Sequence, residues 1–133
     1  MKNSERNTTE REGRRFDFPA AADVVIWKGT LAAMNALGLA VPGSATAGLA
    51  TLGIAEETAD NTGGAAGAVR VTAKRGTFLL RNCAAGDEIT GAHVGSPCYV
   101  VDNETVALTH ATNSRPVAGT IRAVEQGGVW VEI

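Results

Sequence analysis

The carboxy-terminal segment Val117–Ile133, VAGTIRAVEQGGVWVEI, decides the class of fold. Its two apolar runs, Val117–Val124 and Val129–Ile133, flank a polar link with two consecutive glycines. In the second run the branched apolar side chains share one face and Trp130 lies on the other, which is the period of a half-buried β-strand. The segment therefore predicts a β-hairpin joined by Glu125–Gly128.

The same pattern recurs through the rest of the body. Short segments rich in β-branched residues are separated by Gly, Pro, Asn and Asp turns, and only Ile89–Val94 indicates a helical turn. We therefore expect one all-β domain over residues 16–133, a small β-barrel or β-sandwich with one short helix, in which Glu57–Gly67 is a polar loop. The other predicted strands are Phe16–Pro19 at a sheet edge, Asp23–Lys28, Thr30–Met34, Leu37–Val41, Leu49–Glu56, Ala68–Lys74, Thr77–Arg81, Pro97–Asp102 and Thr105–Thr109.

The predicted core takes apolar residues from the inward faces of these strands. The chain of 133 residues is long enough to bury such a core without a disulfide framework. Cys83 and Cys98 are expected to be buried, reduced thiols. The predicted core residues are Val25, Ile26, Leu31, Leu39, Leu52, Ile54, Val69, Val71, Leu79, Val100, Val106, Ile121 and Val131.

Residues 1–15 form a polar arm. They contain no apolar residue after Met1, so the arm cannot bury surface by itself and is expected to be flexible or to become ordered on a partner. Phe16 and Phe18 follow it and would add a strand to an exposed sheet edge. The basic residues of the arm are Lys2, Arg6, Arg11, Arg14 and Arg15.

Charge and hydropathy disfavour two classes of partner, nucleic acids and membranes. The net charge of −2 disfavours general nucleic-acid binding, which needs clustered cations. The uncharged stretch Leu31–Ala55 is interrupted by Asn35, Pro42 and several glycines, and no secretion signal is evident. We expect no direct nucleic-acid partner and no membrane partner.

A search for chemistry finds no catalytic, cofactor-binding or metal-binding motif. His93 and His110 are the only histidines, and no GxSxG or CxxC motif occurs. The Gly-rich stretch Thr62–Gly67 precedes a strand and not a helix, so it is expected to be a surface loop rather than a phosphate site. We expect a protein that is not an enzyme and needs no cofactor.

Interaction surfaces are the remaining candidates. The densest basic patch of the body combines Arg70, Lys74 and Arg75 with Arg81, and it is either a solvated strand face or a docking surface for an acidic protein. Each tryptophan either packs in the core or contacts another subunit. The candidate interaction residues are Arg11, Arg14, Arg15, Phe16, Phe18, Trp27, Arg70, Lys74, Arg75 and Trp130.

A family resemblance rests on six short segments of the body. They are Ala21–Thr30, Gly53–Glu57, Asp60–Gly64, Arg75–Phe78, Cys98–Asp102 and Val129–Val131. Together they resemble small proteins encoded beside the major capsid gene of tailed bacteriophages and prophages, over nearly all of residues 16–133. The shared features are turns, strand ends and hairpins, so the resemblance implies no catalytic residue.

The resemblance implies a capsid decoration, or cement, protein. Such a protein is made in the host bacterial cytoplasm, binds the outer surface of the major capsid shell, often as a trimer, and stabilises the head. In lambda-type decoration proteins a flexible arm becomes ordered on the shell. One alternative is a receptor- or glycan-binding module, such as a head fibre base, with a groove around Trp130, Asp102 and Glu132. The other is a hydrolase fragment, which would need His93 or His110 bonded to a Ser or Cys.

Overall fold

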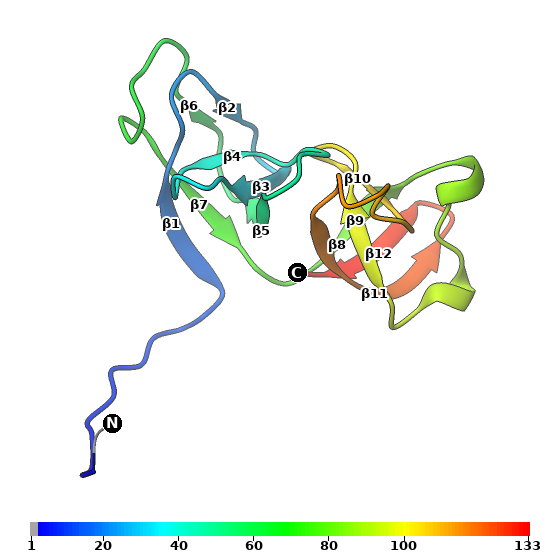
Figure 1. The fold of residues 1–133 in the computed structure, drawn as a ribbon, viewed down its shortest axis with the longest axis horizontal. Coiled ribbons are helices and arrows are strands. Elements are labelled where there is room, and N and C mark those ends of the chain that lie inside the picture. Colours follow the sequence, from blue (N-terminus) through cyan, green and yellow to red (C-terminus); the bar gives the residue numbers. More distant parts are fainter. Residues whose placement is uncertain (1–2) are drawn as a thin grey trace.

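The computed structural model describes residues 3–133 and shows an all-β protein, as the sequence predicts. Figure 1 shows two sheet assemblies side by side, with an extended amino-terminal arm leaving one of them. We call strands β1–β7 the amino-terminal lobe and strands β8–β12 the barrel. In the part of the chain that the structure describes, no helix is long and apolar enough to cross a membrane.

The amino-terminal lobe is a five-stranded antiparallel sheet in the order β1-β7-β5-β3-β4. A bridge between Ala20 and Ala40 joins the end of β1 to β4, so the sheet curls towards closure. Strands β2 and β6 form a separate antiparallel pair. The bounds are β1 Arg15–Pro19, β2 Val25–Ile26, β3 Leu31–Met34, β4 Ala40–Pro42, β5 Ala50–Ala55, β6 Ala59–Asp60 and β7 Arg70–Lys74.

The second assembly is a closed barrel in the order β10-β8-β12-β11-β9. The pair β10–β8 is parallel and the other pairs are antiparallel. The predicted terminal hairpin is confirmed as β11 and β12. The bounds are β8 Thr77–Asn82, β9 Pro97–Val100, β10 Thr105–Ala107, β11 Val117–Glu125 and β12 Gly128–Glu132, with 3-10 turns η1 Ala85–Asp87 and η2 Gly91–His93.

Each assembly has its own apolar core, and Leu31 joins the two. The lobe core is rich in alanine, whereas the barrel core contains larger branched side chains. Leu31 belongs to β3 but is fully buried in the barrel core. Its backbone N–H donates to the Asn103 carbonyl at 2.8 Å, and Thr51 Oγ1 donates to the Val117 carbonyl at 2.6 Å. These contacts fasten the lobe to the barrel.

Most predicted core residues are buried or half-buried, but the prediction for Leu79 is wrong. Its side chain is 45% exposed, and Leu80 is the leucine that enters the barrel core. The sequence presents two consecutive leucines, and a shift of one residue exchanges the two faces of a strand. The predicted residues that are buried are Ile26, Leu31, Val71, Val100, Val106, Ile121 and Val131, and those that are half-buried are Val25, Leu39, Leu52, Ile54 and Val69.

Three local predictions need correction. The strand predicted over residues 23–28 shortens to β2, because Asp23 has a positive φ of 54° and the Trp27 carbonyl accepts the Thr30 N–H in a turn. The predicted loop over residues 57–67 contains β6, which pairs with β2. The helical turn predicted over residues 89–94 is confirmed only as the 3-10 turn η2, because Ile89 lies before that turn and is buried in the barrel core; the second 3-10 turn, η1, was not predicted.

The terminal hairpin offers a matched test of this fold. Gly128 has a φ of 142°, and a Cβ atom there would lie 2.2 Å from the Leu80 carbonyl oxygen, whereas the nearest atom to a Cβ at Gly127 is 3.8 Å away. We expect Gly128→Ala to lower the free energy of unfolding by more than about 1 kcal/mol, and Gly127→Ala to change it by less than about 0.5 kcal/mol. Urea unfolding measures both, and equal effects would contradict this hairpin geometry.

Candidate interaction surface

The structure brings most of the predicted interaction residues together on strands β1 and β7. Antiparallel pairing sets Arg15 opposite Lys74 and Pro19 opposite Arg70. Because neighbouring residues of a strand point to opposite faces, these pairs share one face of the sheet and Phe16 and Phe18 lie on the other. The strand β1 therefore presents one charged face and one apolar face.

The apolar face fastens the start of the body to its own sheet. Phe18 lies opposite Val71 and packs against the lobe core, and Phe16 is half-buried. The Arg11 guanidinium lies 4.4 Å from the centroid of the Phe16 ring, within the range of a cation–π contact. The predicted edge strand is confirmed, and its partner within this chain is β7.

The charged face holds several engaged groups. Arg15 Nε donates to both carboxylate oxygens of Glu56, at 2.8 and 2.9 Å. Arg70 Nη2 donates to the Asp17 carbonyl at 3.0 Å, and Thr72 Oγ1 donates to the Asp17 carboxylate at 2.6 Å. The two acids of this face are therefore already occupied by neighbours in the same lobe.

The arm leaves the body beside this face. Residues 3–14 are exposed and run away from the lobe as an extended segment (Figure 1). The last backbone contact is the Arg75 N–H, which donates to the Arg14 carbonyl at 2.8 Å. Arg14 also lies 3.6 Å from Glu12 within the arm. The regular strand begins at Arg15, so the extended part ends at residue 14.

Positive charge without a carboxylate partner gathers at the same place. Every arginine of the barrel forms an ion pair, whereas within residues 3–133 no ion pair involves Lys28, Lys74 or Arg75. A cation that already has a carboxylate neighbour gains less from a second acid than a free cation does. The barrel pairs are Arg81–Glu104, Arg115–Asp87 and Arg122–Glu132.

Two adjoining hollows lie where the lobe meets the barrel. Their volumes are about 400 and 380 Å3, and both are lined by Lys74 and Phe78. We call them together the junction groove and define it by its principal lining residues. These are Arg14, Lys28, Ile54, Lys74, Arg75 and Phe78. Sequence reasoning missed Lys28 and Phe78, because only the packing of the two assemblies brings them to this groove.

The two tryptophans lie on different assemblies, Trp27 on the lobe and Trp130 on the barrel. Trp27 is 58% exposed at the turn between β2 and β3. Trp130 is half-buried on the outer face of the barrel, opposite Leu79 on one neighbouring strand and Ala123 on the other. Core packing therefore does not account for Trp27, and Trp130 contributes to an apolar strip on the barrel surface.

The carboxylates considered for a glycan groove both have partners. Asp102 Oδ1 accepts the backbone N–H groups of Glu104 and Thr105, at 2.9 and 2.8 Å, in the turn between β9 and β10. Glu132 forms an ion pair with Arg122. Acids held in this way are less available to bind sugar hydroxyls beside Trp130.

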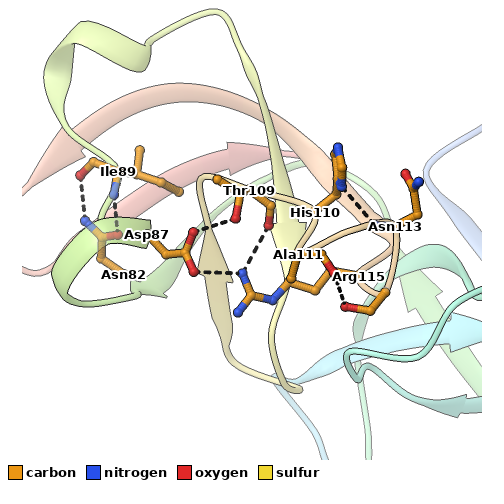
Figure 2. Close-up of polar contacts among 9 residues, drawn as sticks. Asn82, Asp87, Ile89, Thr109, His110, Ala111, Asn113 and Arg115 are labelled. Carbon is orange, nitrogen blue, oxygen red and sulfur yellow. Dashed lines mark hydrogen bonds and ion pairs between the residues drawn. The ribbon is translucent and has the colours of Figure 1, made fainter.

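A polar cluster at one end of the barrel was not anticipated from the sequence (Figure 2). Asp87 accepts hydrogen bonds from Thr109 Oγ1 at 2.5 Å and Arg115 Nη1 at 3.2 Å. The hydrogen bond from Thr109 lowers the pKa of the Asp87 carboxyl below its usual value of 3.8, and the bond from Arg115 lowers it further. The same arginine donates to the Thr109 carbonyl at 3.1 Å, so the cluster ties η1 to the loop after β10.

That loop has an uncommon backbone. Residues 111–113 have φ values of 45°, 58° and 62°, the left-handed region that non-glycine residues rarely enter. The His110 carbonyl accepts the N–H groups of Ser114 and Arg115, and His110 Nδ1 accepts the Asn113 N–H at 2.9 Å. These bonds, with the Asp87–Arg115 pair, hold the turn in place.

Both histidines contact neighbouring groups of the barrel. His93 Nδ1 accepts the backbone N–H of Thr90 at 2.9 Å and lies 3.2 Å from Thr90 Oγ1, and the His110 ring packs edge-on against Tyr99. No Ser or Cys is hydrogen-bonded to either ring within residues 3–133. In that same range no group of three or more His, Cys, Asp or Glu side chains could hold a metal ion.

The two cysteines are free thiols. Cys98 is buried in the barrel core, and this burial raises its pKa to about 11. Cys83 is half-buried, so the expectation of burial is right for Cys98 and only partly right for Cys83. A thiol with a raised pKa is a poor nucleophile, which agrees with a packing role for Cys98.

Comparison with known proteins adds no relative. No protein-family model matches the chain, and neither a curated protein nor a solved structure matches it significantly. The arm, the charges and the groove described above are therefore the features from which a function can be proposed.

The boundary between arm and body can be tested by truncation. We expect removal of residues 1–13 to change the free energy of unfolding by less than about 0.5 kcal/mol, because residues 3–13 are exposed. Removal of residues 1–19 should cost at least about 2 kcal/mol, because it also removes β1 and the packed Phe18. Equal losses in thermal or urea unfolding would show that the arm is part of the folded body.

The Asp87 cluster predicts an acid response. The pKa of Asp87 is lower in the folded protein than in the unfolded chain, where it is near 3.8. The ionised carboxylate therefore stabilises the fold above pH 3.8, and this stabilisation is lost as the pH falls through the folded-state pKa. We expect Asp87→Asn to be less stable than the parent at neutral pH, and this gap to narrow below pH 3.8. Urea midpoints from pH 7 to pH 2 measure it, and a gap that stays constant with pH would contradict the assignment.

Proposed function

We propose that this chain is a phage capsid decoration protein, which binds the outer surface of the major capsid shell and stabilises the head. The observation that carries the proposal is the arm: residues 3–14 are exposed and extended, and they continue directly into the anchored strand β1. An extended segment on a firm base can follow a partner surface and become ordered there. The resemblance to proteins encoded beside capsid genes supports the same role.

The body supports the proposal through its charge distribution. Within the described residues, four cations of the body have no ion-pair partner, and all of them, Lys28, Arg70, Lys74 and Arg75, lie on or at the end of the lobe from which the arm leaves. Complementary charge orients a docking protein and raises its rate of association more than it raises affinity. The arm and this lobe would then face the shell while the barrel faces outward.

Self-association belongs to the same proposal, with a trimer favoured. Each single contact with the shell can be weak when several arms are linked in one oligomer on a repeating lattice, because the later contacts form at high effective concentration. The apolar strip of Leu79 and Trp130 on the outside of the barrel is a surface that contact between subunits would cover.

Co-sedimentation with capsids tests the proposal. Undecorated capsids, assembled from the major capsid protein of the same genome, are mixed with the full-length chain or with a chain lacking residues 1–13. We expect saturable binding by the full-length protein and at least a tenfold weaker affinity for the truncated one, a difference of about 1.4 kcal/mol.

The outcomes separate the parts of the proposal. Equal saturable binding by both proteins would keep the decoration role and refute the arm mechanism. Failure of the folded full-length protein to bind would refute the decoration role. Binding to a glycan array by that same sample would then favour a receptor-binding module.

A further inference from the structure

We propose that the junction groove binds an extended acidic segment of a partner protein, in which an apolar side chain adjoins the carboxylates. Because the inference rests on the proposed function for the identity of the partner, that partner is the major capsid protein. The groove is a second contact, which adjoins the last residue of the arm, Arg14, and it defines which face of the body meets the shell.

The rim of the groove supplies the positive charge. Lys28 and Lys74 line one hollow, and Arg14, Lys74 and Arg75 line the other. The only carboxylate lining these hollows is Glu56, which is already paired with Arg15 at 2.8 Å. The net charge that an incoming segment meets at the rim is therefore positive, although the whole chain carries −2.

The floor of the groove supplies an apolar contact. Ile54 and Phe78 line it, and Ile54 also packs against the barrel core. A Cβ at Gly76 would lie 3.2 Å from the tip of the Phe78 ring, so the ring rests against the backbone of this glycine. Carboxylates at the rim and an apolar side chain on the floor would match this pattern, since burial of the apolar group adds affinity that charge alone does not give.

The walls of the groove are fixed before binding. Lys28 and Lys74 come from the amino-terminal lobe and Phe78 from the barrel, and Leu31 holds these two assemblies together. A preorganised groove loses less conformational entropy when a ligand binds than a flexible surface does.

An acidic protein segment fits this groove better than a nucleic acid. A nucleic acid carries a charge at every nucleotide and needs a long track of cations. In residues 15–133 the cations without an ion-pair partner are few, namely Lys28, Lys74 and Arg75 at the groove and Arg70 on β7, while the neighbouring barrel carries Glu104, Glu132 and Asp87 in ion pairs with its arginines. A short segment with a few carboxylates matches the size of the cluster.

A peptide titration tests the groove directly. The probe is a capped hexapeptide in which Glu alternates with Leu, and its control replaces each Glu by Gln. Binding is followed by chemical-shift changes in 15N-labelled full-length protein. We expect saturable shifts confined to the groove and the neighbouring backbone, no saturation with the Gln peptide, and weaker binding as salt rises.

Two matched double variants complete the titration. Lys28→Gln with Lys74→Gln removes two groove cations, and Arg81→Gln with Arg122→Gln removes two barrel cations. The first should weaken peptide binding about tenfold and the second less than about twofold, because only the first pair faces the groove. Both variants must keep the parent amide spectrum outside the substituted sites.

Several results would overturn the inference. They are an absence of saturable shifts with the Glu peptide, equal losses in the two double variants, or tighter binding of a single-stranded DNA oligonucleotide at the same residues.

Co-sedimentation separates this inference from the proposed function. If the Lys28/Lys74 variant binds capsids as well as the parent does, the groove contact is refuted and the decoration role stands. If the parent binds the peptide but not the capsid, the decoration role is refuted, and the preference of the groove for acidic segments stands.

Discussion

The burial of Leu31 in the barrel is the contact on which the shape of this protein depends. Its strand is paired with β4 and β5 in the amino-terminal lobe, yet its side chain completes the core of the other assembly. Because protein cores are close-packed, a side chain held in this way allows little sliding between the parts it joins. The junction groove follows from that attachment, whereas the pairing of β1 with β7 sets where the arm leaves the body.

The two assemblies differ in how many of their cations form ion pairs. In the barrel, acid–base pairs such as Arg115–Asp87 neutralise one another, and one of them holds a backbone turn in the left-handed region. In the amino-terminal lobe, Arg15 neutralises Glu56 and leaves Lys28 and Lys74 without acids. A barrel whose arginines are all paired and a lobe with unpaired cations are suited to one face that docks on an acidic partner and one that stays in solvent.

The sequence predicts the class of fold because alternation and turn residues are local signals. The terminal hairpin and the edge strand with Phe16 and Phe18 follow from them directly. The choice between Leu79 and Leu80, and the presence of Lys28 in a groove, depend on contacts between distant segments, so no local pattern contains them. The left-handed turn after His110 does not follow from the sequence either, because only Asn113 of its three residues favours a positive φ, and Ala111 and Thr112 do not.

Cryo-electron microscopy of capsids incubated with the full-length chain tests the central claim most directly. The account predicts ordered density for both assemblies on the outer surface, repeated by the symmetry of the shell, with Lys28 and Lys74 facing the capsid protein and the arm lying along it. Capsids with a bare outer surface would contradict the decoration role. A body attached through the barrel, with the arm free in solvent, would contradict the docking face.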